Sequence, residues 1–187
     1  MEIAPVYVID IRNEFRHLPA FTSYINFCYW LNSNRNPKFV RQPYTQEFTR
    51  KDQYRFIFNT QREWEELYRM LSKFRNCTIV VDEADSIFTV NKFQKPLIDV
   101  FLGARNNNVS MIFIGKRPSL IPIIVRSQAD TFTIFCVEEE YDINYLEKRV
   151  KQEFPKDVFK LERGEAIIFK SGEKPIVTQF DKFKGEL

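Results

Sequence analysis

Apolar residues recur along this chain in two spacings, one typical of buried strands and one typical of amphipathic helices. Short apolar runs of strand length lie at 5–9, 77–81 and 109–114, and each predicts a buried strand. A helix is predicted after Thr60 and Glu63, which together have the spacing of a capping box. The apolar positions on one face of this helix are Trp64, Leu67, Tyr68, Leu71 and Phe74.

Weaker patterns predict the remaining elements. The expected helices cover 21–31, 95–104 and 142–153, and the further strands 38–41, 54–58, 131–137, 165–169 and 175–179. The last two strands flank Ser171-Gly172, which predicts a β-hairpin. Strands that alternate with helices predict an α/β fold with a mainly parallel sheet flanked by helices, here with a C-terminal β-hairpin. The length of the chain favours a single domain over residues 1–187.

The strand at 77–81 carries the clearest chemical signal, because it ends in two carboxylates, Asp82 and Glu83. A continuous apolar run suits a strand of a parallel sheet, and open α/β sheets bind ligands at the carboxyl ends of their strands. There Asp82 would hold Mg²⁺ through a water and Glu83 would polarise an attacking water, which is what a Walker B motif requires. The alternative is a strand followed by a solvated acidic turn.

The composition of the chain argues against several kinds of site and compartment. Five glycines in 187 residues fall well below the average of about 7%, which argues against a glycine-rich phosphate loop. The net charge of +3 permits contact with nucleic acid without demanding it. Three well-separated cysteines indicate free thiols in a reducing compartment, and a single histidine, His17, argues against His-based catalysis. We find no membrane-spanning run and no signal-peptide pattern, and therefore expect a cytoplasmic protein.

Four stretches between residues 76 and 180 follow one another in a recognisable order. They are Ile79–Ala84, similar to the Walker B motif; Gly103-Ala104-Arg105 with the strand that follows; Lys116-Arg117-Pro118, similar to a Gln-Arg-Pro motif, with Arg126 and Ala129-Asp130 after it; and Arg163–Ile168, similar to a closing hairpin. Their order resembles the HerA/FtsK superfamily of P-loop DNA-translocating ATPases, which includes small viral genome-packaging ATPases. The resemblance implies a RecA-like P-loop NTPase core.

The family's phosphate loop, G-x-x-x-x-G-K-[ST], is absent from the sequence. When this motif is aligned between the first strand and the first helix, Asp10 and Phe15 replace its glycines, Arg16 its lysine and His17 its Ser/Thr. Phe15 adds bulk where the backbone must curl around a phosphate, Asp10 adds negative charge, and His17 is a poor Mg²⁺ ligand. The resemblance implies ATP and Mg²⁺ as cofactors, but at this degenerate nucleotide site we expect weak ATP binding or none.

A second registration is also open. In it, Val6–Ile9 and Asp10 form the family's second strand, and the phosphate loop is lost from an N-terminally shortened copy. We prefer the first registration, because the family's first strand is central and its loss would leave apolar strand faces and backbone groups unpaired. The 72 positions from Asp10 to Asp82 also leave room for a helix, a second strand and the capped helix, and residues 36–48 resemble the family's second strand.

Three cations are candidates for a role near the acids. Lys116 stands where the family carries a polar sensor, often Gln, and a lysine cannot accept a hydrogen bond. It would instead pair with Asp82 or Glu83 and turn a metal site into a structural ion pair. Arg105 and Arg126 are candidates for an arginine finger that reaches a neighbouring subunit's site. The alternative is that each arginine is a surface cation or pairs with a local acid.

Basic and aromatic residues interleave between positions 35 and 56, a pattern that suits binding to phosphate backbones and stacking on bases. We prefer the simpler interpretation, a solvated edge with aromatic core residues. The residues concerned are Arg35, Lys38, Arg41, Arg50, Lys51 and Arg55, with Phe39, Tyr44, Phe48, Tyr54 and Phe56.

The resemblance implies a viral-type DNA-packaging or translocation ATPase-like protein. It would act on double-stranded DNA as a homo-oligomer or as a ring with other subunits, in the host cytoplasm or the virion. Because Walker B stands without an intact Walker A, the sequence leaves open whether this chain is an enzyme. The alternative is a catalytically inactive structural or assembly subunit with the same fold. A third class, an ATP- or Mg²⁺-dependent enzyme that uses the acidic pair without a phosphate loop, would need a chemistry that the sequence does not identify.

Overall fold

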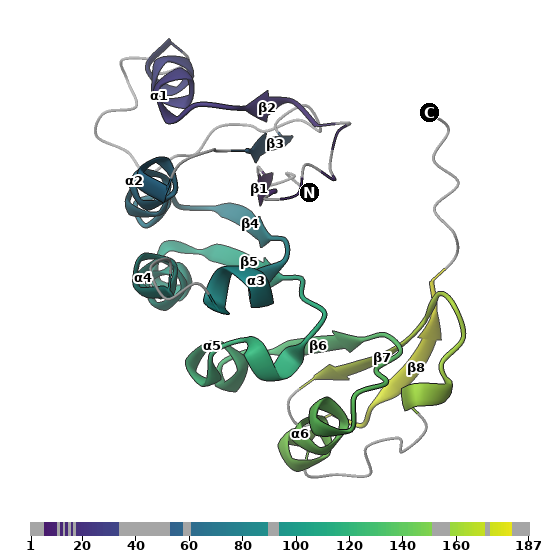
Figure 1. Ribbon diagram of the computed structural model, residues 1–187. Helices are drawn as coiled ribbons and strands as arrows, with labels where there is room; N and C mark the ends of the chain where they lie inside the picture. Colours follow the sequence, from purple (N-terminus) through teal and green to yellow (C-terminus); the bar gives the residue numbers. More distant parts are fainter. Residues whose placement is uncertain are drawn as a thin grey trace. The chain divides into compact units, whose positions relative to one another are not determined.

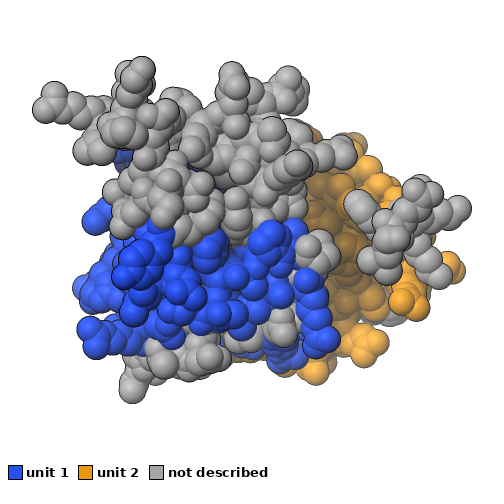
Figure 2. Space-filling model, turned by 90° about the horizontal axis from the view of Figure 1, so that it is seen from above, with its two compact units in different colours: residues 1–116 blue, residues 117–187 orange. Residues whose placement is uncertain are grey.

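The computed structural model describes residues 6–10, 12, 14, 16, 18–33, 53–57, 61–89, 94–150, 158–170 and 173–180. The chain divides into two compact units, residues 1–116 and residues 117–187, which Figure 2 shows in different colours. Each unit contains its own β-sheet. The single domain expected over residues 1–187 stays a prediction.

Unit 1 is built on a five-stranded parallel sheet with the strand order β2-β3-β1-β4-β5 (Figure 1). This architecture confirms the predicted α/β fold with a mainly parallel sheet. In chain order its elements are β1 (Val6–Ile9), β2 (Ala20–Phe21), α1 (Tyr24–Ser33), β3 (Gln53–Phe56), α2 (Gln61–Leu71), β4 (Cys77–Val81), α3 (Ala84–Thr89), α4 (Gln94–Ala104), the 3-10 helix η2 (Arg105–Asn107) and β5 (Val109–Phe113).

The core of unit 1 forms where α2 and the turn after it meet the sheet. All five apolar positions predicted for this face, from Trp64 to Phe74, are buried, which confirms the prediction. The Phe74 ring packs edge-on against Tyr7 of β1 with 5.0 Å between centroids. Glu63 accepts a hydrogen bond from the Tyr24 N–H and so ties the first turns of α1 and α2 together. The predicted cap residue Thr60 and the predicted strand 38–41 lie outside the described residues.

The strand predicted at 109–114 is present as β5, but the prediction that it is buried was wrong. Its side chains alternate between half-buried and exposed, and Ile112 is 50% exposed. Among the described strands β5 pairs only with β4, so it lies at the edge of the sheet. An apolar run cannot distinguish a central strand from an edge strand, because both require the same side chains.

Unit 2 contains an antiparallel three-stranded sheet in the order β6-β7-β8. The pairing of β7 with β8 confirms the predicted hairpin. The strand expected at 131–137 is shorter and pairs with β7, so it does not extend the parallel sheet. The elements are the 3-10 helix η3 (Pro118–Leu120), α5 (Ile123–Ser127), β6 (Thr131–Ile134), α6 (Glu140–Val150), the 3-10 helix η4 (Val158–Lys160), β7 (Glu165–Lys170) and β8 (Ile176–Gln179).

A small hydrophobic core holds unit 2 together. One face of α6 packs through Leu146 against the sheet, and the other buried members are Ile134, Val158, Ile167 and Phe169. None of the helices in the described part of the chain is long and apolar enough to cross a membrane.

Candidate functional site

The two acids predicted as a Walker B pair lie directly at the carboxyl end of β4. Both are buried, with exposed fractions of 6% for Asp82 and 7% for Glu83. The Asp82 N–H donates to the Ile9 carbonyl at the end of β1, and the Glu83 carbonyl accepts from Ile87 in the first turn of α3. The backbone therefore fixes both side chains between the ends of β1 and β4 and the start of α3.

Glu83 has a left-handed backbone conformation with φ of 50°. Side chains without a local hydrogen-bonding role rarely adopt this region, and strain of this kind often accompanies functional sites. The conformation allows the chain to turn from β4 into α3, where Ala84 donates its N–H to the Ile114 carbonyl at 2.7 Å. The sequence carried no sign of this turn, because Glu is not a typical residue at positive φ.

Two cations and a hydroxyl contact the Glu83 carboxylate. Lys116 Nζ lies 3.0 Å from Oε1 and Arg12 Nη2 lies 3.4 Å from Oε2. Ser86 donates its hydroxyl to Oε2 at 3.4 Å. Of the two acids considered as a partner for Lys116, the ion pair forms with Glu83. Lys116 is 66% exposed along its side chain, so water screens this pair and it can open readily.

The carboxylate of Asp82 differs from that of Glu83 in its hydrogen bonding. Its Oδ2 is buried and has no hydrogen-bond partner among the described residues. Burial raises the pKa of Asp82, and the negative charges of Glu14, Glu83 and Asp10 raise it further, while a backbone hydrogen bond from Glu83 opposes the shift. An unpartnered carboxylate oxygen in an acidic surrounding is the kind of group that Mg²⁺ binds, since this ion prefers oxygen and keeps several waters.

A third acid, Asp85, lies beside this pair and was not singled out from the sequence. It is 6% exposed, and its Oδ1 also lacks a partner among the described residues. A Cβ atom added at Gly115 would lie only 3.0 Å from that oxygen. A glycine after β5 thus allows close approach to Asp85, and this spatial relation has no signal in the sequence.

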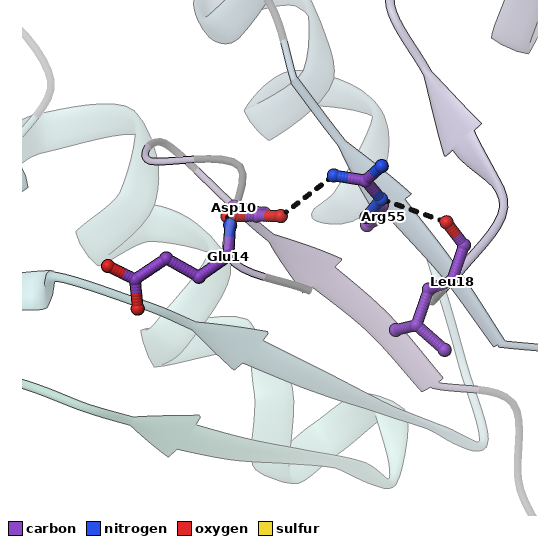
Figure 3. A network of polar contacts seen from close by, with 4 residues as sticks. All are labelled: Asp10, Glu14, Leu18 and Arg55. Carbon is purple, nitrogen blue, oxygen red and sulfur yellow. Dashed lines mark hydrogen bonds and ion pairs between the residues drawn. The ribbon is translucent and has the colours of Figure 1, made fainter. Parts of the chain in front are cut away.

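At the end of the neighbouring strand β1, Asp10 is fully buried and both of its oxygens are engaged (Figure 3). Oδ1 accepts the Glu14 N–H at 2.8 Å, and Oδ2 lies 3.1 Å from Arg55 Nη1 on β3. Arg55 also donates Nε–H to the Leu18 carbonyl at 2.8 Å. The Glu14 side chain points away from the guanidinium in Figure 3. This network ties both ends of the segment after β1 to the sheet.

This network differs from a phosphate loop. A phosphate loop offers free backbone N–H groups and a cation to its ligand. Here the Glu14 N–H and the Arg55 guanidinium already bind the Asp10 carboxylate, and Asp10 would repel a phosphate. Arg16 is exposed, while Phe15 and His17 lie outside the described residues.

The interpretation of 35–56 as a solvated basic edge is wrong for Arg55, which is 8% exposed and inside the Asp10 network. Phe56 is fully buried, as expected for an aromatic core residue. The remaining basic residues of this set lie outside the described residues. Sequence alone could not identify Arg55 as the partner of Asp10, because the contact joins positions 45 apart on adjacent strands.

The two candidate finger arginines belong to different units of the chain. Arg105 is exposed in η2 and precedes β5, so it lies at the amino end of the strands, opposite Asp82 and Glu83 within unit 1. Arg126, in unit 2, places its guanidinium 3.9 Å from the centroid of the Tyr145 ring. Its Nε and Nη1 are buried without a hydrogen-bond partner among the described residues. Within unit 1, Arg105 therefore does not lie at the acids, and the role of Arg126 stays a prediction.

Comparison with solved structures identifies relatives of this fold. The genome packaging NTPase B204 from Sulfolobus turreted icosahedral virus 2, in complex with AMPPCP, superposes with a TM-score of 0.70 at 15% identity, covering 97% of this chain and 84% of B204. Its complex with ATP-γS gives 0.68 at 16% identity over 96% and 83%. B204 described as the DNA-packaging ATPase of Sulfolobus turreted icosahedral virus gives 0.59 at 16% identity, over 97% and 100%.

Comparison of sequences identifies the family. No curated protein matches this chain. The family model of the zonular occludens toxin, Zot, matches residues 31–136, more than half of the chain and the part that includes β4, its two acids and Lys116. The resemblance to P-loop ATPases of the HerA/FtsK group is thereby confirmed, since Zot is a P-loop ATPase related to them. This chain belongs to the Zot family.

Proposed function

We propose that this chain is a viral-type DNA-packaging or translocation ATPase-like subunit that does not bind Mg·ATP on its own. Its fold is that of B204, whose structures are described as those of a genome packaging NTPase in complex with AMPPCP and ATP-γS. Two buried acids at the carboxyl end of β4, Asp82 and Glu83, support the proposal, because phosphoryl-transfer sites of this class hold Mg²⁺ with such an acid. The Glu14 N–H, in the segment where the phosphate loop is expected, is engaged by the Asp10 carboxylate and not offered to a phosphate.

The contacts of Asp10 support the proposal that the chain does not bind Mg·ATP on its own. The Asp10 carboxylate is already bound to the Glu14 N–H and to Arg55, so the segment after β1 holds an internal anion. A phosphate group would have to displace a fully buried carboxylate and its buried cation. Breaking a buried ion pair is costly, about 3–5 kcal/mol, and phosphate binding at this place would have to offset that cost.

Each acid has a role under this proposal. Asp82 would hold Mg²⁺ through its unpartnered Oδ2, with waters completing the coordination. Glu83 would orient the attacking water once Lys116 leaves it, because a carboxylate paired with two cations is a poor hydrogen-bond acceptor for water. Arg105 would act on a neighbouring subunit, since it lies at the opposite end of the strands from its own Asp82. Double-stranded DNA and a ring of subunits are the partners that fit such a motor, in the host cytoplasm or the virion.

A second candidate function is a catalytically inactive structural or assembly subunit. The observation that favours it is the set of contacts on Glu83, where Lys116, Arg12 and Ser86 together satisfy the carboxylate. In that case the acids at the end of β4 would be structural. Glu83→Gln separates the two functions: it should abolish turnover of an assembled motor, and it should leave the assembly of an inactive subunit intact.

Calorimetric titration of Mg·ATP into the purified chain tests the proposal. We expect no saturable heat at micromolar concentrations of protein. Asp82→Asn serves as a control, because it removes the proposed Mg²⁺ ligand and should not change a result without binding. A micromolar dissociation constant that Asp82→Asn abolishes would show that the chain binds Mg·ATP by itself, and the proposal would fail.

A further inference from the structure

The chain passes from unit 1 to unit 2 between two consecutive basic residues, Lys116 and Arg117. Each of them is paired with a buried acid of its own unit. Lys116 Nζ lies 3.0 Å from Oε1 of Glu83 in unit 1. Arg117 Nε lies 2.6 Å from Oδ2 of Asp142 in unit 2. A single peptide bond therefore joins the two residues that form these ion pairs.

The unit 2 side of this connection is held at several points. Asp142 is fully buried, and besides Arg117 it binds the Ser119 N–H, which donates to Oδ1 at 3.0 Å. The Arg117 backbone is extended, with φ of −120° and ψ of 93°. Pro118 restricts the residue before it to this region, because its ring clashes with a helical neighbour. Rotation about the Arg117 backbone is therefore limited, and the residue before it follows the position of unit 2.

The unit 1 side of the connection is fixed only as far as Ile114. Its N–H donates to a carbonyl of β4 at 2.9 Å, and its carbonyl accepts from the first residue of α3 at 2.7 Å. Gly115 and Lys116, which follow, make no backbone hydrogen bond with any part of the chain that the structure describes. Because glycine has the widest backbone freedom, a change in the orientation of unit 2 is absorbed chiefly at Gly115.

The pair between Lys116 and Glu83 depends on where this connection places the lysine. Glu83 cannot follow a moving partner, because it is 7% exposed and its backbone is fixed between β4 and α3. The Lys116 side chain is 66% exposed, so water screens its attraction to the carboxylate. Holding a lysine side chain in one geometry also costs rotamer freedom. A pair this weak forms only when the backbone keeps the ammonium group within reach.

From these contacts we infer that Asp142 is a positioning residue for Glu83. By holding Arg117, it keeps Lys116 within reach of the Glu83 carboxylate. Resting on the proposed function, this connection gives unit 2 control over the group that orients the attacking water. A partner that turns unit 2 withdraws Lys116 and makes Glu83 available to water. The alternative is that unit 1 alone holds Lys116, whatever happens at Asp142.

The reactivity of the Lys116 amine toward an N-hydroxysuccinimide acetyl ester distinguishes the two, because a carboxylate partner makes the amine less available. The rate is measured by mass spectrometry on the full chain without nucleotide, relative to the exposed Lys95 of α4. Glu83→Gln removes the partner and sets the upper limit, which we expect at about two- to fivefold above the wild type for an exposed pair. Asp142→Asn and Arg117→Gln should each give at least about half of that increase.

Three further variants separate positioning from a general loss of structure. Arg117→Lys keeps a cation for Asp142 and should react like the wild type. Glu138→Gln removes an exposed charge shortly before α6 and should also leave the rate unchanged. Ile134→Val weakens the core of unit 2 and keeps both ion pairs, so it too should leave Lys116 at the wild-type rate. Since Arg117 is 40% exposed, Arg117→Gln carries the test if Asp142→Asn does not fold.

Wild-type rates in Asp142→Asn and Arg117→Gln, together with a raised rate in Glu83→Gln, would overturn the inference, because unit 1 alone would then hold Lys116. An unchanged rate in Glu83→Gln would overturn it as well, since the ion pair would not form in solution. An equal increase in Ile134→Val would assign the effect to a loosened core and contradict a positioning role. Binding of Mg·ATP by the chain would instead contradict the proposed function and leave these rates in place.

Discussion

The ends of β1 and β4 carry the same residue in two different states. Asp10 follows β1 and Asp82 follows β4, on adjacent parallel strands, and both are buried. Asp10 has a partner for each oxygen, one of them the guanidinium of Arg55. Asp82 keeps an oxygen without a partner and has a raised pKa. The contrast teaches that partners, more than position or burial, decide whether a carboxylate at a strand end serves structure or remains available for chemistry.

The largest expected loss of stability comes from breaking the ion pair between Asp10 and Arg55. Arg55→Met keeps most of the side-chain volume but leaves Asp10 buried without its cation. We expect a loss of about 3–5 kcal/mol in the free energy of unfolding, measured with chemical denaturant. The matched control is Arg69→Met, which removes an exposed i,i+3 pair with Glu66 and should cost less than about 0.5 kcal/mol. Equal losses in the two variants would mean that the buried pair of Asp10 and Arg55 stabilises the protein no more than an exposed ion pair does.

Another buried acid, Asp142 in α6, resembles Asp10 because both of its oxygens have partners. Ser119 donates its N–H to Oδ1 at 3.0 Å, and Arg117 donates Nε–H to Oδ2 at 2.6 Å. Burial tends to raise the pKa of Asp142, but the hydrogen bonds from Ser119 and the charge of Arg117 outweigh it, and the net pKa is lowered.

Because the folded-state pKa of Asp142 lies below its ordinary value, the carboxylate stabilises the protein above that ordinary value. This stabilisation is lost as the pH falls through the lowered pKa. Asp142→Asn should therefore cost about 1.5–3 kcal/mol at neutral pH and much less in acid, measured by urea unfolding. Glu138→Gln, an exposed neighbour in the sequence, is the control. A cost independent of pH would mean that packing, and not the charge, is what Asp142 contributes.

Asp82→Asn should raise the free energy of unfolding, whereas Asp142→Asn should lower it. The raised pKa means that the folded state disfavours the charged form, so the stability of the wild type decreases as the pH rises through that pKa. Removing the charge should then stabilise the chain by about 1 kcal/mol at neutral pH, the scale of one unsatisfied buried oxygen. The gain should disappear in acid, where the wild-type carboxyl is protonated. Destabilisation at neutral pH would indicate that Asp82 has a partner like that of Asp10.

The smallest change in the free energy of unfolding is expected at Lys116, at the exposed edge of the site. Lys116→Met removes the ion pair to Glu83, but Lys116 is 66% exposed and Glu83 keeps Arg12 and Ser86. We expect the free energy of unfolding to change by less than about 1 kcal/mol. Gln at the same position should behave similarly and provides a polar control. A loss of several kcal/mol would show that Lys116 is a structural partner of Glu83 comparable to Arg55.

Much of the fold could be predicted from the sequence, because local patterns specify it. The apolar run at 77–81 and the acids after it predicted β4 and the place of Asp82, and the capped amphipathic pattern predicted α2. The exposure of β5 could not be predicted, since an apolar run is compatible with either the centre or the edge of a sheet. The left-handed turn at Glu83 has no residue signature either.

The partners of the site residues were harder to predict than their positions. Lys116 was expected to pair with one of the two acids, and only the structure identifies Glu83 as the partner. Arg55 belonged to a pattern of alternating basic and aromatic residues that suited nucleic-acid contact. Its burial follows from the parallel pairing of β1 with β3, which brings Arg55 beside Asp10. Long-range pairings of this kind are set by strand order, which one sequence does not reveal.

The most direct test of this account is a pH titration of the aspartate side-chain carboxyl carbons by NMR, with Asp82 assigned through Asp82→Asn. The account predicts that Asp82 titrates above the ordinary range for aspartate. Glu14→Gln should move its midpoint part of the way back, because the Glu14 charge contributes to the shift. A midpoint at or below the ordinary value would contradict the account, because Asp82 would then be a stabilised, partnered carboxylate like Asp10 and not a group available for a metal ion.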